Sequence, residues 1–175
     1  MKKINSYKNI ILDRDGIINE VIHRGNIISS PRNLSEFKYR DDFILFYKNA
    51  PKNISFYVFT NQPDVQRGLL NINELDKIHD DIYKKFNIKK IYFCPHDDSA
   101  DCNCRKPLPG MINEIIDEFN IKIAETLVIG DSLKDIDAAR SLGMDYCFLM
   151  TEYNENSVKK NNISFTVNAL LELLL

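Results

Sequence analysis

Short apolar runs alternate with amphipathic segments along this chain, and the alternation predicts its secondary structure. Five runs are rich in β-branched or aromatic residues and are followed by turn-forming residues, a pattern typical of buried strands. They comprise residues 10–12, 55–59, 91–93, 127–129 and 146–149. We therefore expect five short strands, spread over most of the chain.

The segments between these runs show the apolar spacing of helices. In residues 74–86, for example, Leu75, Ile78, Ile82 and Phe86 fall on one helical face. We expect further helices at residues 41–49 and 110–119, from Asp131 or Ser132 to Gly143, and in the tail 167–175. Strands that alternate with helices predict an α/β fold with a largely parallel sheet.

Composition and charge narrow the class of protein. The 175 residues are 44% hydrophobic and 27% charged, which is enough for one core and one domain over residues 1–175. The formal net charge of -2 argues against a general nucleic-acid binder. No apolar stretch approaches the ~20 residues that span a bilayer, and the N-terminus lacks the apolar segment of a signal peptide. We therefore expect a cytoplasmic monomer that binds neither nucleic acid nor membranes.

One long segment, residues 16–40, shows neither a strand period nor a helix period. A loop of this length inside a compact domain is usually functional. We predict that it is a loop on the substrate side of the molecule.

Polar side chains follow three of the predicted strands. Asp13 comes after the first strand, Thr60 and Asn61 after the second, and Gly130 with Asp131 after the fourth. In open parallel α/β sheets, ligands bind at the carboxyl ends of the strands. The sequence therefore predicts one site that these residues share.

The carboxylates of this predicted site have spacings that suit phosphate chemistry. Asp13 and Asp15 are two residues apart, so in an extended chain both can face one reacting centre, Asp13 as a nucleophile and Asp15 as a proton carrier. A polar β-turn is the alternative for this segment. Asp131 can complete a Mg²⁺ site with Asp13, because Mg²⁺ prefers oxygen ligands, or it can cap a helix. Asp135 is expected to cap the helix together with Ser132 rather than to contact metal.

A second group of residues has the composition of a zinc site. Cys94, His96, Cys102 and Cys104 lie within residues 94–104 and can supply all four tetrahedral ligands. A disulfide fits poorly, because two of the cysteines are almost adjacent and the chain is expected in a reducing compartment. We predict a structural Zn²⁺ in this loop, since four protein ligands leave no open position for catalysis.

Several other polar residues allow two interpretations. Lys106 can offset phosphate charge and orient a nucleophilic carboxylate, or it can be a solvated surface lysine. His79 is expected to face solvent, and His23 either approaches substrate or is solvated. The loop carboxylates are expected to be solvated, namely Asp97, Asp98 and Asp101.

Four segments together resemble the motifs of the haloacid dehalogenase superfamily of phosphatases. They are Asp13-Arg14-Asp15-Gly16-Ile17-Ile18-Asn19, Thr60-Asn61-Gln62, Arg105-Lys106-Pro107 and Gly130-Asp131. The cysteine and histidine spacing narrows the resemblance to the zinc-loop subgroup. This resemblance implies a Rossmann-like parallel sheet with helices on both faces and no large cap domain.

The resemblance also implies roles for individual residues. Asp13 is then the nucleophile and Asp15 the acid and base, and Mg²⁺ is held by Asp13, Asp131 and the main-chain carbonyl of Asp15. Thr60 and Lys106 are implied to contact the phosphate in the transition state. The residues assigned to substrate binding are Asn19, Asn61, Gln62, Arg105 and Lys106.

The implied substrate is a small sugar bisphosphate. The subgroup includes phosphatases that cleave D-glycero-D-manno-heptose 1,7-bisphosphate at the 7-phosphate and phosphatases of histidinol phosphate. Residues 105–111 resemble the heptose enzymes more than the histidinol enzymes. Residues 23–27 depart from the Gly-Tyr-Val that heptose enzymes often carry. The alternatives are histidinol phosphate or another small phosphomonoester, a polynucleotide 3′-phosphate, and a zinc-bearing binding module without activity. Arg105 is assigned to the second phosphate, with a surface ion pair to a loop carboxylate as its alternative.

Overall fold

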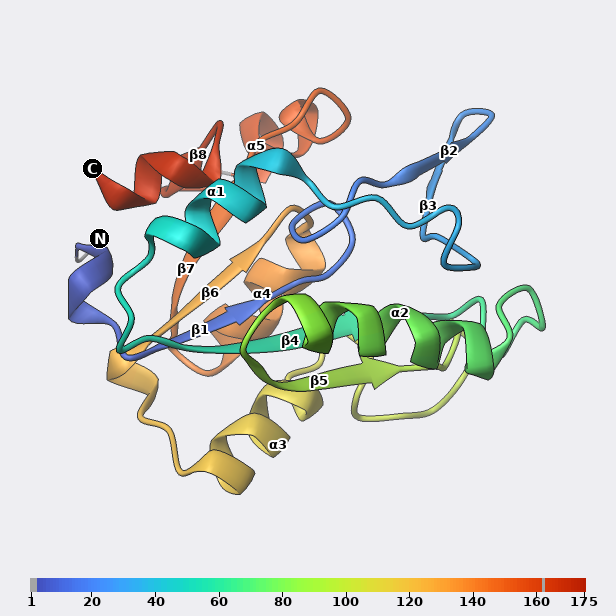
Figure 1. The fold of residues 1–175 in the computed structure, drawn as a ribbon, viewed down its shortest axis with the longest axis horizontal. Helices are drawn as coiled ribbons and strands as arrows, with labels where there is room; N and C mark the ends of the chain where they lie inside the picture. The colour runs from blue at the N-terminus through green and yellow to red at the C-terminus, as the bar shows by residue number, and fades with distance from the viewer. Residues whose placement is uncertain (1–2, 162) are drawn as a thin grey trace.

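The computed structural model describes residues 3–161 and 163–175, and its centre is a six-stranded parallel sheet (Figure 1). The strand order is β5-β4-β1-β6-β7-β8, and every neighbouring pair is parallel. The strands are β1 Asn9–Leu12, β4 Ser55–Asn61, β5 Ile88–Cys94, β6 Thr126–Gly130, β7 Asp145–Leu149 and β8 Thr166–Val167. The five predicted strands are confirmed, and the two-residue strand β8 extends the sheet beyond them.

Helices follow the strands in alternation. They are α1 Asp41–Asn49, α2 Ile72–Lys85, α3 Gly110–Phe119, α4 Leu133–Ser141 and α5 Glu155–Asn161, with 3-10 helices at Ile4–Ser6, Ile123–Glu125 and Leu170–Leu174. The predictions of α1 to α4 are confirmed, and the predicted tail helix is a shorter 3-10 helix. The helix α5 was not predicted, because Val158 is the only apolar residue in it. Within the described parts of the chain, no helix has the length and apolar character needed to cross a membrane.

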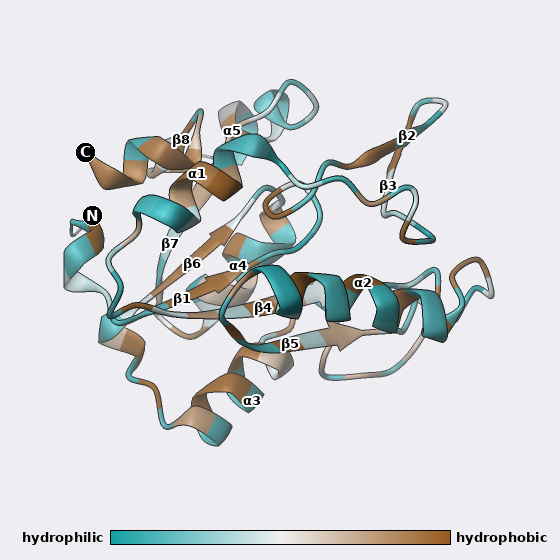
Figure 2. Ribbon diagram, in the orientation of Figure 1, coloured by the Kyte–Doolittle hydropathy of each residue, from teal (hydrophilic) through white to brown (hydrophobic). Residues whose placement is uncertain are grey.

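The sheet has a hydrophobic core on each face because successive strand side chains point to opposite sides. Ile10 and Leu12 of β1 pack in one cluster with residues of α1 and α2, such as Phe43. Ile11, between them, packs in another cluster with residues of α3 and α4, such as Ile112. Figure 2 shows apolar strands at the centre and a polar outer face on α2. The expectation of helices on both faces is therefore confirmed.

The segment 16–40 contains a β-hairpin that projects beyond the carboxyl end of the sheet (Figure 1). Strands β2 Ile22–Arg24 and β3 Ile27–Ser29 pair antiparallel around a turn in which Gly25 has a φ of +64°. The prediction of a loop is wrong for these residues. The hairpin lies away from both cores, and Ile27 is 69% exposed, so the burial that normally imposes an alternating pattern is absent here.

Candidate active site

A cavity of about 730 Å³ lies where the strands β1, β4 and β6 end. Among the residues that line it are Asp13, Asp15, Thr60, Lys106 and Asp131. The first and last of these directly follow β1 and β6, and Thr60 is the penultimate residue of β4. The prediction that polar groups from three strands share one site is confirmed.

Lys106 is buried beside the proposed nucleophile, not solvated. Its ammonium lies 2.8 Å from Asp13 Oδ1 and 2.6 Å from Asp135 Oδ1, and it donates to the Phe59 carbonyl at 3.1 Å. Only 3% of the residue is exposed. Burial alone would lower the pKa of Lys106, but the two carboxylates raise it above its ordinary value. The lysine is therefore a fixed positive charge at the centre of the site.

Asn61 fixes the backbone of Lys106 across the cavity wall. Its Nδ2 donates to the Lys106 carbonyl at 3.1 Å, and its Oδ1 accepts from the Lys106 amide at 3.0 Å. These two hydrogen bonds join the end of β4 to the loop before α3. Asn61 also lines the cavity. Asn61, which was predicted to bind substrate, thus lines the cavity and also holds the backbone of Lys106.

Three carboxylates gather beside this lysine. Oxygen atoms of Asp13, Asp131 and Asp135 lie within 4.8 Å of one another, and all three residues are buried. Burial and the charge of Asp135 raise the pKa of Asp13 well above its ordinary value, and the same two causes raise that of Asp131 to about 7. Carboxylates that repel each other this strongly fit a bound divalent cation, and oxygen ligands suit Mg²⁺.

Asp135 both caps the helix α4 and pairs with Lys106. Its Oδ2 accepts from the amide and the hydroxyl of Ser132, which is the predicted helix cap. Its Oδ1 pairs with Lys106 inside the acidic cluster. The expectation that Asp135 only caps the helix is therefore incomplete, because the first turn of α4 lies against the cluster.

Glycine at position 16 allows the chain to pass close to this cluster. Gly16 has a φ of +84°, and a Cβ atom there would lie 2.0 Å from Asp131 Oδ2. Any side chain would therefore displace the carboxylate.

Asp15 is surrounded by hydrogen-bond donors. Arg14 donates to it from Nε at 3.2 Å and from Nη2 to both oxygens at 3.0 Å. Asn19, Ser30 and Gln62 donate at 2.9, 2.8 and 2.7 Å. Burial would raise the pKa of Asp15, but the Arg14 charge and these hydrogen bonds lower it below its ordinary value. Asp15 is thus held as a carboxylate.

Two residues predicted to bind substrate occupy a different position. Asn19 and Gln62 are fully buried and lie outside the lining of the cavity. They contact Asp15, and Gln62 also donates to Thr60 Oγ1 at 3.0 Å. Both side chains donate to Asp15, so they hold this carboxylate in place rather than reach into the cavity.

Behind Asp15 lies a buried pair that the sequence did not indicate. Arg14 is fully buried, and its Nη1 lies 3.3 Å from His79 Nε2. His79, on α2, is 7% exposed, so the prediction that it faces solvent is wrong. Burial and the Arg14 charge lower the pKa of His79 to about 3. The polar neighbours of His79 along α2 concealed this inward position.

Two further residues contact Asp131 and its backbone in the loop after β6. Tyr153 donates to Asp131 Oδ2, and Asn154 donates from Nδ2 to the carbonyls of Asp131 and Leu149 at 2.8 and 3.0 Å. Both residues belong to the segment between β7 and α5. They carry no motif, and only the folded chain brings them to Asp131.

The cysteines and histidine of residues 94–104 come together as the sequence predicts. Cys94 Sγ lies 3.1 Å from Cys104 Sγ and 3.8 Å from Cys102 Sγ, and His96 Nδ1 lies 3.3 to 3.4 Å from Cys104 and Cys94. In tetrahedral zinc coordination the edges are about 3.8 Å between sulfurs and about 3.5 Å from sulfur to nitrogen. The donor set therefore fits Zn²⁺.

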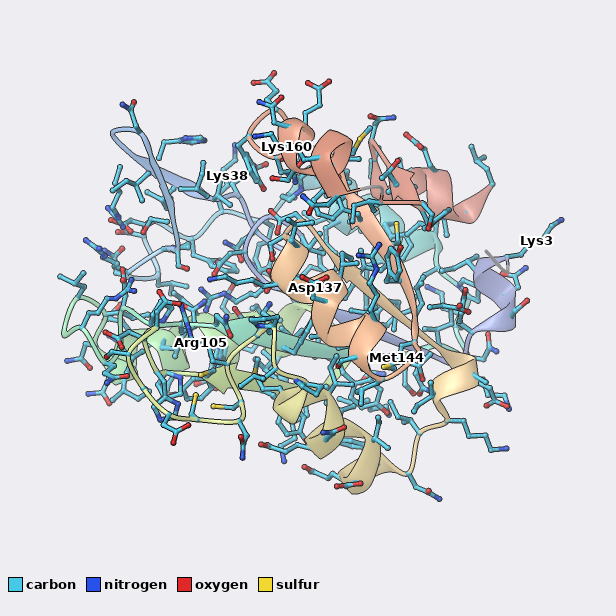
Figure 3. The ribbon with its side chains drawn as sticks, turned by 180° about the vertical axis from the view of Figure 1, so that it is seen from behind. Lys3, Lys38, Arg105, Asp137, Met144 and Lys160 are labelled. Atoms are coloured by element: carbon cyan, nitrogen blue, oxygen red, sulfur yellow. The ribbon has the colours of Figure 1, made fainter. Side chains whose placement is uncertain are left out.

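The mouth of the cavity carries positive side chains on several segments. Those that line it are Arg24, Arg32, Arg67, Arg105 and Lys134. Each is paired with a carboxylate: Arg24 with Glu36, Arg32 and Arg67 with Asp64, and Arg67, Arg105 and Lys134 with Asp98. Figure 3 shows Arg105 at the end of the molecule where the hairpin projects.

Comparisons with known proteins agree with this geometry. A family model described as HAD-hydrolase-like matches residues 103–173. The chain is 33% identical to a D-glycero-beta-D-manno-heptose-1,7-bisphosphate 7-phosphatase of Neisseria meningitidis serogroup A, with 88% of this chain and 83% of the relative covered. It is 31% identical to a D-glycero-alpha-D-manno-heptose-1,7-bisphosphate 7-phosphatase of Photorhabdus laumondii, with 96% and 98% covered.

A solved structure is similar over nearly the whole chain. The D,D-heptose 1,7-bisphosphate phosphatase of B. bronchiseptica, complexed with magnesium and phosphate, matches with a TM-score of 0.81 and 26% identity. The match covers 93% of each chain. The similarity thus extends far beyond the short motifs.

Proposed function

The chain belongs to the haloacid dehalogenase-like phosphatases, and we propose that it removes one phosphate from a small sugar bisphosphate. D-glycero-D-manno-heptose 1,7-bisphosphate, cleaved at the 7-phosphate, is the leading candidate. Relatives that carry this reaction in their names support the choice, and they cover most of this chain.

The charge of the cavity mouth is the observation that carries the proposal. Five cations line it, and their carboxylate partners are only three, so two positive charges remain in excess. This excess suits a second phosphate dianion on the substrate. Histidinol phosphate carries an amine at its far end, which the same charges would repel. A sugar bisphosphate is therefore favoured over that alternative.

The buried centre supplies groups for two successive displacements. A carboxylate oxygen of Asp13 attacks phosphorus, the bond from phosphorus to the sugar oxygen breaks, and an aspartyl phosphate forms. Water then attacks that phosphorus, inorganic phosphate leaves, and the Asp13 carboxylate is restored. Lys106, within 2.8 Å of Asp13, stabilises the charge that develops on the transferring group.

Asp15 carries the proton in both steps. It gives a proton to the departing sugar oxygen and takes one from the attacking water. The low pKa of Asp15 suits the second task. Phosphate bound beside Asp13 adds negative charge, which raises the pKa of Asp15 toward the protonated form that the first task needs.

The donor sets indicate which residues would hold metal ions. Asp13 and Asp131 of the acidic cluster, together with the main-chain carbonyl of Asp15 that the family resemblance implies, would hold Mg²⁺, which neutralises phosphate charge when bound. Cys94 and His96, with the two cysteines at the other end of their loop, would hold a structural Zn²⁺. One domain, a monomeric state and a cytoplasmic location stay predictions from the sequence.

Phosphate release from a panel of substrates tests the proposal. The panel contains both anomers of the heptose 1,7-bisphosphate, histidinol phosphate, p-nitrophenyl phosphate and a 3′-phosphorylated oligonucleotide. We expect kcat/KM to be highest for a heptose bisphosphate and the 1-phosphate to remain on the product. Preference for histidinol phosphate or for the oligonucleotide would contradict the proposal.

A further inference from the structure

Three cations at the mouth of the cavity converge on one carboxylate, that of Asp98. Arg105 donates to Asp98 Oδ1 from Nε at 3.1 Å and from Nη2 at 2.7 Å. The Lys134 ammonium lies 3.8 Å from the same oxygen, and Arg67 Nη2 lies 3.5 Å from Oδ2. The cations belong to α4, to the loop before α2 and to the zinc loop, so tertiary folding assembles the group.

Arg105 keeps its position without Asp98. Its Nη1 donates to the His96 carbonyl at 2.9 Å, and its side chain is only 11% exposed. Its backbone directly follows Cys104 of the predicted zinc site. Asp98 accepts both remaining donors on a single oxygen, so the parallel two-oxygen grip that a guanidinium can form is unused. Asp98 is thus a partner of Arg105 and not its support.

Asp98 is also easy to displace. Its side chain is 69% exposed, and those of Lys134 and Arg67 are 52% and 40% exposed. Exposed ion pairs contribute little to stability, because water screens them. Arg67 also pairs with Asp64, but Asp64 is shared with Arg32, so positive charge remains unbalanced. A phosphate dianion carries more charge and more acceptor oxygens, so it can engage all three cations better than Asp98 does.

We propose that Asp98 is an internal competitor for the distal phosphate of the substrate. Its carboxylate occupies the anion position formed by Arg67, Arg105 and Lys134, and the distal phosphate replaces it on binding. Every ligand of this position has to displace Asp98 and loses the same binding free energy, so a singly charged group, which binds the three cations more weakly than phosphate does, is left with little net affinity. This inference rests on the proposed function, because it requires a substrate with a second phosphate.

Binding of a ligand that carries only the distal group tests this role. The probe is mannose 1-phosphate, and mannonate, which has a carboxylate at the same end of its carbon chain, is the comparison. In Asp98→Asn, we expect the Kd of mannose 1-phosphate to fall about fivefold, because an amide keeps the shape and removes the competing charge. The affinity for mannonate should rise by a similar factor, because removal of a shared competitor helps every anion at this position equally.

The matched control is Asp101→Asn, which makes the same charge change in the same loop. Asp101 is exposed and makes no ion pair within the described residues. It should leave both Kd values unchanged. Asp98→Ala serves as a second variant, and the melting temperature of each protein shows that it is folded. Turnover of p-nitrophenyl phosphate, which has one phosphate, should be equal in the wild type and in Asp101→Asn.

The outcomes separate the two proposals. Unchanged or weaker binding of mannose 1-phosphate to Asp98→Asn overturns the competitor role while leaving the proposed function intact, and weaker binding identifies Asp98 as a clamp. If Asp101→Asn shows the same fivefold gain in affinity, the competitor role is overturned as well, because the gain then comes from the lower negative charge of the loop and not from Asp98 itself. Wild-type protein that neither binds mannose 1-phosphate nor prefers a bisphosphate overturns both proposals.

Discussion

The charges at the centre of the site and those at the mouth of the cavity form ion pairs of the same chemical kind in different surroundings. At the centre, Lys106 is 3% exposed and pairs with Asp135, whose side chain is fully buried. At the mouth, Lys134 and Asp98 are 52% and 69% exposed. Water screens the second pair and barely reaches the first, so equal charges interact much more strongly at the centre.

This difference separates two tasks that one cavity has to perform. Groups that take part in bond making must already be in place, because reorganising them during the reaction would raise the barrier. Lys106 meets this need with three fixed contacts. Groups that choose a substrate must exchange partners, and the exposed contacts of Asp98 permit that. Substitutions at the centre should therefore have large effects on every substrate, and those at the mouth smaller effects on particular ones.

The largest effect should come from Asp13→Asn. An amide cannot form the acyl phosphate, so turnover should fall at least ~1,000-fold on both bisphosphate and p-nitrophenyl phosphate. The fold should survive, because the amide keeps the volume and removes one of three mutually repelling carboxylates. Phosphate release and thermal unfolding measure the two effects.

The control is Asp137→Asn, on the exposed side of α4, which should keep full activity. Fluoroberyllate, a phosphate mimic, should form its adduct on Asp13 in the wild-type protein. An adduct on another residue, or normal turnover by Asp13→Asn, would falsify the assignment of the nucleophile.

A smaller effect should follow from Cys102→Ser, which acts on the loop between the two regions. The purified wild-type protein should hold about one zinc per chain, and the variant should lose this zinc. Its free energy of unfolding should fall by ~3 kcal/mol or more, which corresponds to a decrease of roughly 10 °C in Tm. The loop carries Asp98 and ends at Arg105, so the bisphosphate should lose more kcat/KM than p-nitrophenyl phosphate does.

Metal analysis, thermal unfolding and kinetics on both substrates check this expectation. Cys147→Ala is the control, because Cys147 is buried in β7 away from the four predicted ligands. It should lower stability without changing zinc content. Zinc-free wild-type protein with freely reactive thiols would contradict the zinc site.

The sequence was informative at the centre and much less so at the mouth, for a physical reason. Buried strands must be apolar, and their ends must carry the reactive groups, so Asp13 and Asp131 follow recognisable runs. The ion pair of Arg105 with a loop carboxylate was an alternative that the sequence left open, and in the structure that carboxylate is Asp98. Asp98 meets Lys134 and Arg67 only through contacts between distant segments, and no local pattern records such contacts. The β2–β3 hairpin was not predicted for a related reason, since exposed strands need no alternation of apolar and polar residues.

His79 shows the same limit inside the core. A histidine among polar helix residues is normally solvated, but this one fills the space behind Arg14 and packs against Phe93, with ring centroids 5.6 Å apart. No prediction was made for Arg14, the partner of His79, because a motif arginine between two aspartates gives no sign that it is fully buried. Predicting the pair required knowing that α2 places His79 beside the segment that follows β1.

The smallest effect concerns how stability depends on pH, and it arises at His79, behind Asp15. The pKa of His79 is about 3 in the folded protein, below the ordinary value of 6.5, so below pH 6.5 the unfolded chain binds a proton that the folded chain does not. Stability is therefore complete above pH 6.5 and is lost as the pH falls toward 3, by about 2 kcal/mol between pH 7 and pH 5. In His79→Gln this part of the pH dependence should disappear, since the amide can still accept from Arg14 but does not titrate. Denaturant unfolding at pH 7 and pH 5 measures both proteins, and equal slopes for wild type and His79→Gln would mean that the interior behind Asp15 is as open to water as the mouth of the cavity.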